Sequence, residues 1–343
     1  MNVLLLAGGL GTRLRPLTEN LPKPMAPIAN RPWLEHLILH LKAHGLDRFV
    51  IAMKHYPDKI RDYFGDGRKL GVSIQYVLEK QLLGTAGAIK NAEPYLDERF
   101  IVFNADIVHN VDLQPLLAFH ESHGGGVTIG LKEVDDPTQY GVVEQDETGR
   151  ILRFVEKPRL EEAPSKRINA GIYIMDRDVL AAIPANREVS IERETFPLLV
   201  EQKRVYGQTI RGYWMDMGTK ERYRQVHWDL LSREFQLPLS GMEREEGIWV
   251  GRNTRIGTGA MLVPPVLIGD RVTIGDRCVI GPNVVIGDDC HIGPNARLSE
   301  TILWDRCTVR DGAHLNNCIF GYDLELGSGH IIYEAVMNRM GVV

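Results

Sequence analysis

Two patterns of hydrophobic residues follow one another along the chain, and the change falls near residue 240. Up to about residue 233, short β-rich runs alternate with helical patterns, which is typical of a sheet covered by helices. Strands are expected at Val3–Ala7, Arg48–Lys54, Val72–Glu79, Arg99–Asn104 and Val127–Val134. An amphipathic helix is expected over 33–44, because Trp33, Leu37 and Leu41 share a face. The pattern predicts a three-layer α/β domain with a mainly parallel sheet.

A hairpin signal interrupts the alternation of strands and helices. The runs Val142–Glu144 and Ile151–Val155 flank the turn-forming residues Asp146 to Gly149. Hairpin strands are antiparallel, so we expect the sheet of this Rossmann-like domain to be mixed.

A six-residue repeat governs the chain after residue 247. Aliphatic residues recur in register at Val250, Ile256, Leu262, Ile268, Ile274, Ile280, Ile286, Ile292 and Leu298, and glycine follows most of them. Six residues per flat face and three faces per turn describe a left-handed parallel β-helix, with each aliphatic side chain pointing into the prism. The period slips by one residue after Leu298 and resumes at Val309.

These patterns divide the chain into four parts. We expect an α/β domain over 1–235, a linker over 236–247, a left-handed β-helix over 248–330 and a tail over 331–343. The tail resumes a helical pattern and is expected to cap the last coil.

Two sets of potential metal ligands are better explained by packing or solvation. Four cysteines, Cys278, Cys290, Cys307 and Cys318, lie in the repeat, and the first three fit a slot for small residues two positions before an aliphatic one. They lack any Cys-x-x-Cys spacing, so we expect buried packing residues. His36, His40 and His44 share one helix face, but the further ligand and general base of helical zinc sites are missing, so a solvated stripe is expected.

Charge and hydropathy indicate which partners and which cellular location to expect. The 40 Lys+Arg and 45 Asp+Glu residues give a net charge of −5, so no global positive field attracts nucleic acid or anionic lipid. No signal sequence or membrane span is evident, and a cytoplasmic location is expected.

The first strand runs into a loop suited to phosphates. Gly8, Gly9 and Gly11 allow backbone N–H groups to approach an anion, and Arg13 adds a planar cation. The dinucleotide pattern would need glycine at Leu14, and the Walker pattern needs a Gly-Lys-Ser/Thr that is absent. The prolines of Leu21-Pro22-Lys23-Pro24-Met25 stiffen a loop that holds a second cation, Lys23.

The run LAGGLGTRLRPLTENLPKPM resembles the signature of the sugar-1-phosphate nucleotidylyltransferases, whose members often carry a C-terminal hexapeptide β-helix. The resemblance implies that residues 1–235 form the nucleotidyltransferase domain. It also implies that Arg13 orients and neutralises the reacting phosphates and that Lys23 assists. Nucleotide contacts are implied for Ala7, Gly8, Gly9, Gly11 and Thr12.

Two aspartates are expected to bind magnesium. Asp106 follows the apolar strand Ile101–Phe103, at the carboxyl end where open α/β sheets keep their ligands. Asp216, in Trp214-Met215-Asp216-Met217-Gly218, resembles the second metal-binding aspartate of the family. Two carboxylates plus phosphate oxygens suit Mg²⁺.

Further motifs resemble the sugar and base subsites of the family. The resemblance implies that Lys157 grips the sugar phosphate, that Glu156 and Asn169 bind sugar hydroxyls, and that Gly141 gives the ring space. Gly84 and Thr85, at the start of a helix, are implied in base recognition.

The implied reaction is attack of a sugar 1-phosphate oxygen on the α-phosphorus of a nucleoside triphosphate, which releases pyrophosphate. Loops around residues 83–88, 103–106 and 188–192 look most like the mannose-1-phosphate guanylyltransferases. Glucose 1-phosphate with dTTP or UTP is the first alternative, and a heptose 1-phosphate with GTP is another. A catalytically silent regulatory subunit is the alternative from another class. A β-helix end or face is a natural contact between copies, so a homo-oligomer is expected.

Overall fold

The structure, a computed structural model, describes residues 1–239, 241–339 and 341–342, and it forms two compact units. The first unit comprises Met1–Gly9 and Leu37–Trp214, and the second comprises Leu10–His36 and Met215–Val343. Ser240 of the expected linker and Met340 and Val343 of the expected tail lie outside the described residues. The functional division at residues 235, 247 and 330 stays a prediction.

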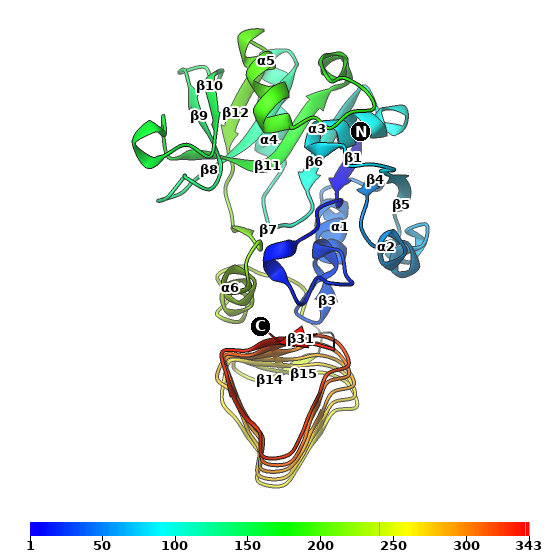
Figure 1. Ribbon diagram of the computed structural model, residues 1–343, viewed down its shortest axis with the longest axis vertical. Helices are drawn as coiled ribbons and strands as arrows, with labels where there is room; N and C mark the ends of the chain where they lie inside the picture. The colour runs from blue at the N-terminus through cyan, green and yellow to red at the C-terminus, as the bar shows by residue number, and fades with distance from the viewer. Residues whose placement is uncertain (240, 340, 343) are drawn as a thin grey trace. The chain divides into compact units, whose positions relative to one another are not determined.

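The first unit is built on a mixed nine-stranded sheet with the order β10-β9-β11-β6-β1-β4-β5, in which β8 pairs with β11 and β12 (Figure 1). The strands are β1 (Asn2–Leu6), β4 (Arg48–Met53), β5 (Ser73–Leu78), β6 (Arg99–Asn104), β8 (Val127–Glu133), β9 (Gly141–Gln145), β10 (Ile151–Glu156), β11 (Arg167–Asp176) and β12 (Val205–Thr209). The five strands expected first are present within one residue at each end. The mixed α/β fold is thereby confirmed.

The sheet has a parallel part and an antiparallel part, as the sequence predicts. β1 pairs in parallel with β4 and β6, and β4 pairs in parallel with β5. β9 and β10 form the expected antiparallel hairpin, and β11 is antiparallel to β6. The carboxyl ends of β1, β4, β5 and β6 therefore lie at one edge of the sheet, where the Gly8–Gly9 loop and Asp106 emerge.

Five helices belong wholly or partly to the first unit. They are α1 (Trp33–Ala43), α2 (Pro57–Phe64), α3 (Gly84–Ala92), α4 (Gln114–His123) and α5 (Phe196–Glu201). Apolar residues of α3 and α5 join the sheet in one core, which includes Leu4, Val102, Ile89, Tyr173 and Phe196. None of the helices in the described residues is long and apolar enough to cross a membrane.

The second unit contains a left-handed parallel β-helix, seen nearly end-on in Figure 1 as a stack of triangular coils. Each of its three faces is a parallel sheet. The first face is β15 (Ile248–Val250), β18 (Val266–Ile268), β21 (Val284–Ile286), β24 (Thr301–Leu303), β27 (Ile319–Phe320) and β30 (Val336–Asn338). The second is β16 (Arg255–Ile256), β19 (Thr273–Ile274), β22 (His291–Ile292), β25 (Thr308–Val309) and β28 (Glu325–Leu326). The third is β17 (Met261–Leu262), β20 (Val279–Ile280), β23 (Arg297–Ser299), β26 (His314–Asn316) and β29 (Ile331–Tyr333).

The interior of the prism confirms the six-residue pattern. The aliphatic positions of the repeat and the small slots, including Cys278, Cys290 and Cys307, form one buried core. All four cysteines are free and buried, as expected for packing residues. Burial raises the pKa of the Cys278 and Cys318 thiols, which keeps them protonated and unreactive.

The first face of the prism differs from the other two on its outer side. Its outward residues Trp249, Leu267, Val285, Ile302 and Ile319 are apolar, and each is at most 7% exposed. The outward column of the second face is Arg255, Thr273, His291, Thr308 and Glu325. Two contacts within the second unit reach this face: the Asn30 amide donates to the Ile286 carbonyl of β21, and Trp304, directly after β24, donates to the Tyr223 hydroxyl of α6 (Lys220–Leu231).

Two expectations from the sequence are wrong. The helical pattern after residue 330 forms strands instead, because β29 and β30 add to the faces of the β-helix and β31 (Gly341–Val342) pairs with β30. The three histidines are not a solvated stripe. His36 is buried with Nε2 2.9 Å from the Ile28 carbonyl, and His40 Nε2 lies 2.9 Å from the Val111 carbonyl. Desolvation by burial lowers the pKa of both rings.

Candidate functional site

The loop that follows β1 begins in the first unit. Ala7 is buried, and its N–H donates to the Ala52 carbonyl at 2.9 Å, which continues the pairing of β1 with β4. A Cβ added to Gly8 would lie 2.8 Å from Glu79 Oε1, whereas one added to Gly9 would meet no atom within 4 Å. A side chain at Gly8 would therefore displace the Glu79 carboxylate, whereas Gly9 faces open space.

The loop continues in the second unit as a single turn of 3-10 helix, Thr12–Leu14. Gly11 caps this turn in the left-handed region with φ 60°, and its added Cβ would lie 3.1 Å from Lys23 Cβ. The Thr18 hydroxyl donates to the Gly11 carbonyl at 2.8 Å. Local backbone geometry thus fixes where the exposed side chains of Thr12 and Arg13 begin.

Three cations surround the Asp216 carboxylate in the second unit. Lys23 Nζ lies 3.2 Å from Oδ1, Arg222 Nη1 lies 3.2 Å from Oδ2, and Arg13 Nη2 lies 3.9 Å from Oδ2. Asp216 ends β13 (Trp214–Asp216), and Arg222 lies in the first turn of α6, after its N-cap Thr219. Lys23 is 7% exposed, while Arg13 is 62% exposed and can reach a ligand with little rearrangement.

The second expected metal ligand, Asp106, lies in the first unit, in the turn between β6 and β7 (Ile107–His109). Its pairing with Asp216 stays a prediction. Within the described ranges, no group of three or more His, Cys, Asp and Glu side chains could hold a metal ion. Mg²⁺ commonly takes one or two carboxylates and completes its shell with water and substrate phosphates. The hard oxygen donors of these two aspartates fit that chemistry.

The start of α3 holds the residues expected to contact the base. Gly84 has φ 66°, and an added Cβ would lie 2.6 Å from the Val189 carbonyl, so only glycine fits. The N–H groups of Ala86 and Gly87 both donate to that carbonyl. The Thr85 hydroxyl donates to Glu192 Oε2 at 3.0 Å and accepts from the Ile191 N–H at 2.8 Å. Thr85 therefore orients the 189–192 segment, and its contact with the base stays a prediction.

The β9–β10 hairpin places three predicted sugar residues together. Gly141 is the register partner of Glu156, and an added Cβ would lie 2.4 Å from the Phe154 ring and 3.0 Å from Glu156 Oε2. Lys157 has φ 49°, and its Nζ lies 3.8 Å from Glu156 Oε1. Burial and then the nearby Glu192 carboxylate raise the pKa of Glu156.

Asn169 lies at an irregularity of β11, where the pairing with β8 shifts register. Its Nδ2 donates to the Tyr173 hydroxyl at 2.9 Å, and its Oδ1 accepts from the Gly171 N–H at 2.9 Å. The Tyr173 hydroxyl is buried and interacts electrostatically with Glu156 and Glu192, and burial raises its pKa well above its usual value. Asn169 is thus fixed by Tyr173, whose hydroxyl interacts with both carboxylates.

Three residues at these subsites were not predicted from the sequence as site residues: Glu79, Glu192 and Arg222. Glu79 follows β5 at the carboxyl edge of the sheet, a position that could have suggested it, and burial raises its pKa. Glu192 lies near the expected base and sugar residues through long-range contacts. Arg222 meets Asp216 because α6 begins just after it.

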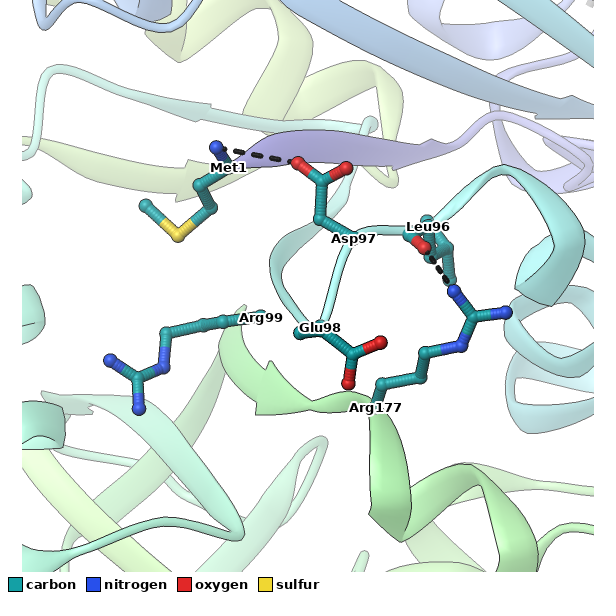
Figure 2. Close-up of a pocket in the computed structure, with 6 residues that line it drawn as sticks. All are labelled: Met1, Leu96, Asp97, Glu98, Arg99 and Arg177. Atoms are coloured by element: carbon teal, nitrogen blue, oxygen red, sulfur yellow. Dashed lines mark hydrogen bonds and ion pairs between the residues drawn. The ribbon is translucent and has the colours of Figure 1, made fainter.

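A separate surface pocket opens at the amino ends of the parallel strands, and Figure 2 shows its lining. The Met1 amino group pairs with Asp97 at 3.3 Å, and Arg177 Nη1 donates to the Leu96 carbonyl at 2.6 Å (Figure 2). None of the predicted site residues lines this pocket.

Comparison with known proteins assigns the chain to a family. Residues 2–233 match the nucleotidyl transferase model, and residues 262–339 match the model of the GMPPB C-terminal domain. A mannose-1-phosphate guanylyltransferase of Mycobacterium tuberculosis is 39% identical over 80% of this chain and 77% of its own length. Mannose-1-phosphate guanylyltransferase 1 of Arabidopsis thaliana is 36% identical over 95% of this chain and 88% of its own length. A UTP–glucose-1-phosphate uridylyltransferase of Synechocystis is 34% identical over 94% and 87%.

A solved structure is also similar to this chain. HddC of Yersinia pseudotuberculosis, complexed with GMP-PN, has a TM-score of 0.57 at 30% identity, over 66% of this chain and 98% of its own. The phosphate loop, its cations and these matches agree. The chain belongs to the nucleotidyl transferase family and is an enzyme of its sugar-1-phosphate nucleotidyltransferase group.

Proposed function

We propose that the chain condenses GTP with mannose 1-phosphate to give GDP-mannose and pyrophosphate. The observation that carries this proposal is the cluster of Arg13 and Lys23 around Asp216, directly after a phosphate-suited loop. The cations of such a cluster can offset the charge of a triphosphate, and its carboxylate can bind a metal ion. The names of the relatives, and GMP-PN in the Yersinia structure, support a guanine nucleotide.

The proposed chemistry needs no nucleophilic side chain. An oxygen of the sugar phosphate attacks the α-phosphorus in line, a new P–O bond forms, and the bond to pyrophosphate breaks. Arg13 and Lys23 would offset the negative charge on the triphosphate, and Lys157 would hold the sugar phosphate. Ala7, Gly8, Gly9, Gly11 and Thr12 would line the nucleotide, and Glu156, Asn169 and Gly141 the sugar. Family members generally use a divalent metal, and we propose that Asp106 and Asp216 would hold Mg²⁺, which would supply Lewis-acid stabilisation of the phosphate charge.

Glu79 supports guanine over the pyrimidines. Its carboxylate lies against Gly8 and follows β5, and burial keeps it poor in water contacts. Guanine offers two adjacent donors, N1–H and N2–H₂, which a carboxylate can accept, whereas uracil and thymine offer one N–H between two carbonyls. We expect Glu79→Gln to lower kcat/KM for GTP about tenfold or more relative to UTP and dTTP.

The test is pyrophosphate release with Mg²⁺, crossing GTP, UTP, dTTP, ATP and CTP with mannose 1-phosphate and glucose 1-phosphate. Strong release for GTP with mannose 1-phosphate supports the proposal. Preference for dTTP or UTP with glucose 1-phosphate overturns the choice of base and sugar. Silence across the grid from folded protein favours an untested sugar such as a heptose or a regulatory subunit. Light scattering of the same sample tests the proposed homo-oligomer.

A further inference from the structure

The part of the signature that follows Gly9 belongs to the same compact unit as the β-helix. This segment, Leu10–His36, carries Arg13 and Lys23, so whatever holds it in place controls the two cations. Its second half forms a short hairpin of β2 (Pro27–Ile28) and β3 (Arg31–Pro32), closed by Ala29 and Asn30 with φ 51° and 65°. Positive φ at both turn residues matches a tight two-residue hairpin loop.

A buried chain of hydrogen bonds connects the β-helix to this hairpin. Trp304, directly after β24, donates its Nε1–H to the Tyr223 hydroxyl at 3.0 Å, and the Tyr223 hydroxyl donates to the Pro27 carbonyl. Tyr223 is fully buried, and Trp304 is 2% exposed. Burial also raises the pKa of Tyr223 well above its usual value, so the hydroxyl keeps its proton and remains a donor.

Direct contacts reach the same segment from two other coils. Asn30 Nδ2 donates to the Ile286 carbonyl at 2.9 Å, on the strand β21 of the first face. The Asn338 amide donates to the Pro16 carbonyl, near Arg13. Hydrogen bonds to the β-helix therefore lie on both sides of Lys23, at Pro16 before it and at Asn30 after it.

Tyr223 also links the two halves of the cation cluster. Pro27 lies four residues after Lys23, and the intervening chain is compact because the Ala26 N–H donates to the Lys23 carbonyl at 3.0 Å. On the other side, α6 carries Tyr223 one residue after Arg222, which pairs with Asp216. One hydroxyl is thus positioned to fix both the loop of Lys23 and the helix that follows Asp216.

We propose that Tyr223 and Trp304 are positioning residues, through which the β-helix holds the catalytic loop in register with Asp216. The catalytic part of this inference rests on the proposed function. The hydrogen bonds matter for the catalytic rate, because a small displacement of groups that align the substrates lowers kcat strongly. The β-helix then positions residues of the active site, in addition to its expected role in contacts between copies of the chain.

The test compares Tyr223→Phe and Trp304→Phe with a matched control, Ile280→Val. Tyr223→Phe keeps the ring and removes the hydroxyl, while Trp304→Phe removes the donor. Ile280→Val removes a methyl group inside the prism, where Ile280 is fully buried, and leaves every hydrogen bond intact. Two readouts are needed: hydrogen exchange at the Met25 and Ala26 amides, and kcat and KM in the full-length enzyme.

We expect amide exchange at residues 25 and 26 to rise on the order of tenfold in both link variants and to stay unchanged in the control. kcat should fall on the order of tenfold in the link variants, with KM for both substrates within about twofold of the original. Unchanged exchange in Tyr223→Phe or, if that variant does not fold, in Trp304→Phe overturns the inference. An equal loss of kcat in Ile280→Val also overturns it. If the unmodified enzyme shows no activity with any substrate pair, amide hydrogen exchange still tests whether Tyr223 and Trp304 hold the loop. Failure of the proposed function is then distinguishable from failure of this inference.

Discussion

Lys23 Nζ lies 3.2 Å from Asp216 Oδ1, although 193 residues separate the two along the chain. The lysine is almost buried, and the aspartate is 17% exposed, so the pair is partly removed from water. A buried charge that loses its partner is costly. Asp216 therefore contributes both to folding stability, through its ion pair with Lys23, and to catalysis, since the same carboxylate is the proposed metal ligand.

Replacing Asp216 should separate these two roles. We expect Asp216→Ala to lower turnover at least a hundredfold and to lower the free energy of unfolding by about 1–3 kcal/mol, because the Asp216 carboxylate no longer accepts from Lys23 and Arg222. Asp216→Asn keeps an oxygen acceptor and should lose as much activity with a smaller loss of stability. Pyrophosphate release and urea denaturation measure the two effects. Near-normal turnover in either variant would contradict the proposed metal site, and Asp106→Ala should be equally inactive.

Arg13 should matter for rate and not for stability. Its guanidinium is 62% exposed and 3.9 Å from Asp216, a geometry in which an ion pair contributes little to folding. We expect Arg13→Ala to reduce kcat about a hundredfold and to change the free energy of unfolding by less than about 0.5 kcal/mol. Arg15→Ala is the matched control, since Arg15 is also exposed and lies two residues away. Equal losses in both variants would mean that general charge, and not Arg13, is responsible.

Much of the fold could be predicted because its signals are local and periodic. The six-residue period marks the inward positions of the prism up to Leu298, and the β-rich runs mark the strands of the sheet. The packing of the signature segment with the β-helix could not be predicted from that period, since it concerns outward positions. A signal was nevertheless present. The runs Ile248–Val250, Val266–Ile268 and Val284–Ile286 are apolar at all three positions, which indicates a strand buried on both sides.

The candidate site was only partly predictable for a related reason. Gly11, Arg13 and Lys23 belong to one continuous motif, whereas Arg222 and Glu192 reach their partners through tertiary contacts that leave no local pattern.

In the tail, a local pattern was present but gave the wrong secondary structure. The tail's apolar residues Ile332 and Val336 are four apart and fit a helical period, but the preceding coil offers unpaired backbone groups, and strand pairing overrides the local tendency.

Gly9 and Gly11 should respond differently to the same substitution. An added Cβ at Gly9 meets no protein atom, so Gly9→Ala should leave stability unchanged and raise KM for the nucleotide if the backbone approaches the phosphates closely. Gly11→Ala must adopt φ 60° and contact Lys23, which should cost about 1–2 kcal/mol and displace Arg13. Thermal unfolding and steady-state kinetics with varied nucleotide check both. An unchanged KM in Gly9→Ala would place the nucleotide elsewhere.

Asp305 gives a prediction for the dependence of stability on pH. Desolvation by burial, followed by the neighbouring Asp288, raises its pKa from 3.8 to about 6, although its carboxylate accepts the Asp288 N–H at 2.9 Å. The unfolded chain ionises this group above about pH 4, whereas the folded protein does so only near pH 6. Stability is therefore lost as pH rises from about 4 to 6, by at most roughly 3 kcal/mol from this residue.

Asp305→Asn removes the ionisation and keeps an oxygen for the Asp288 N–H. We expect the variant to be more stable than the original protein at pH 7–8 by about 1–3 kcal/mol, with no advantage near pH 4. Asp323→Asn is the contrasting control. The hydrogen bond from Arg306 lowers the pKa of Asp323, so this change should destabilise the protein at neutral pH. Urea denaturation at pH 4, 6 and 8 measures the free energy of unfolding of both variants. If Asp305→Asn has the same free energy of unfolding as the original protein at every pH, the Asp305 carboxylate titrates at its usual pKa.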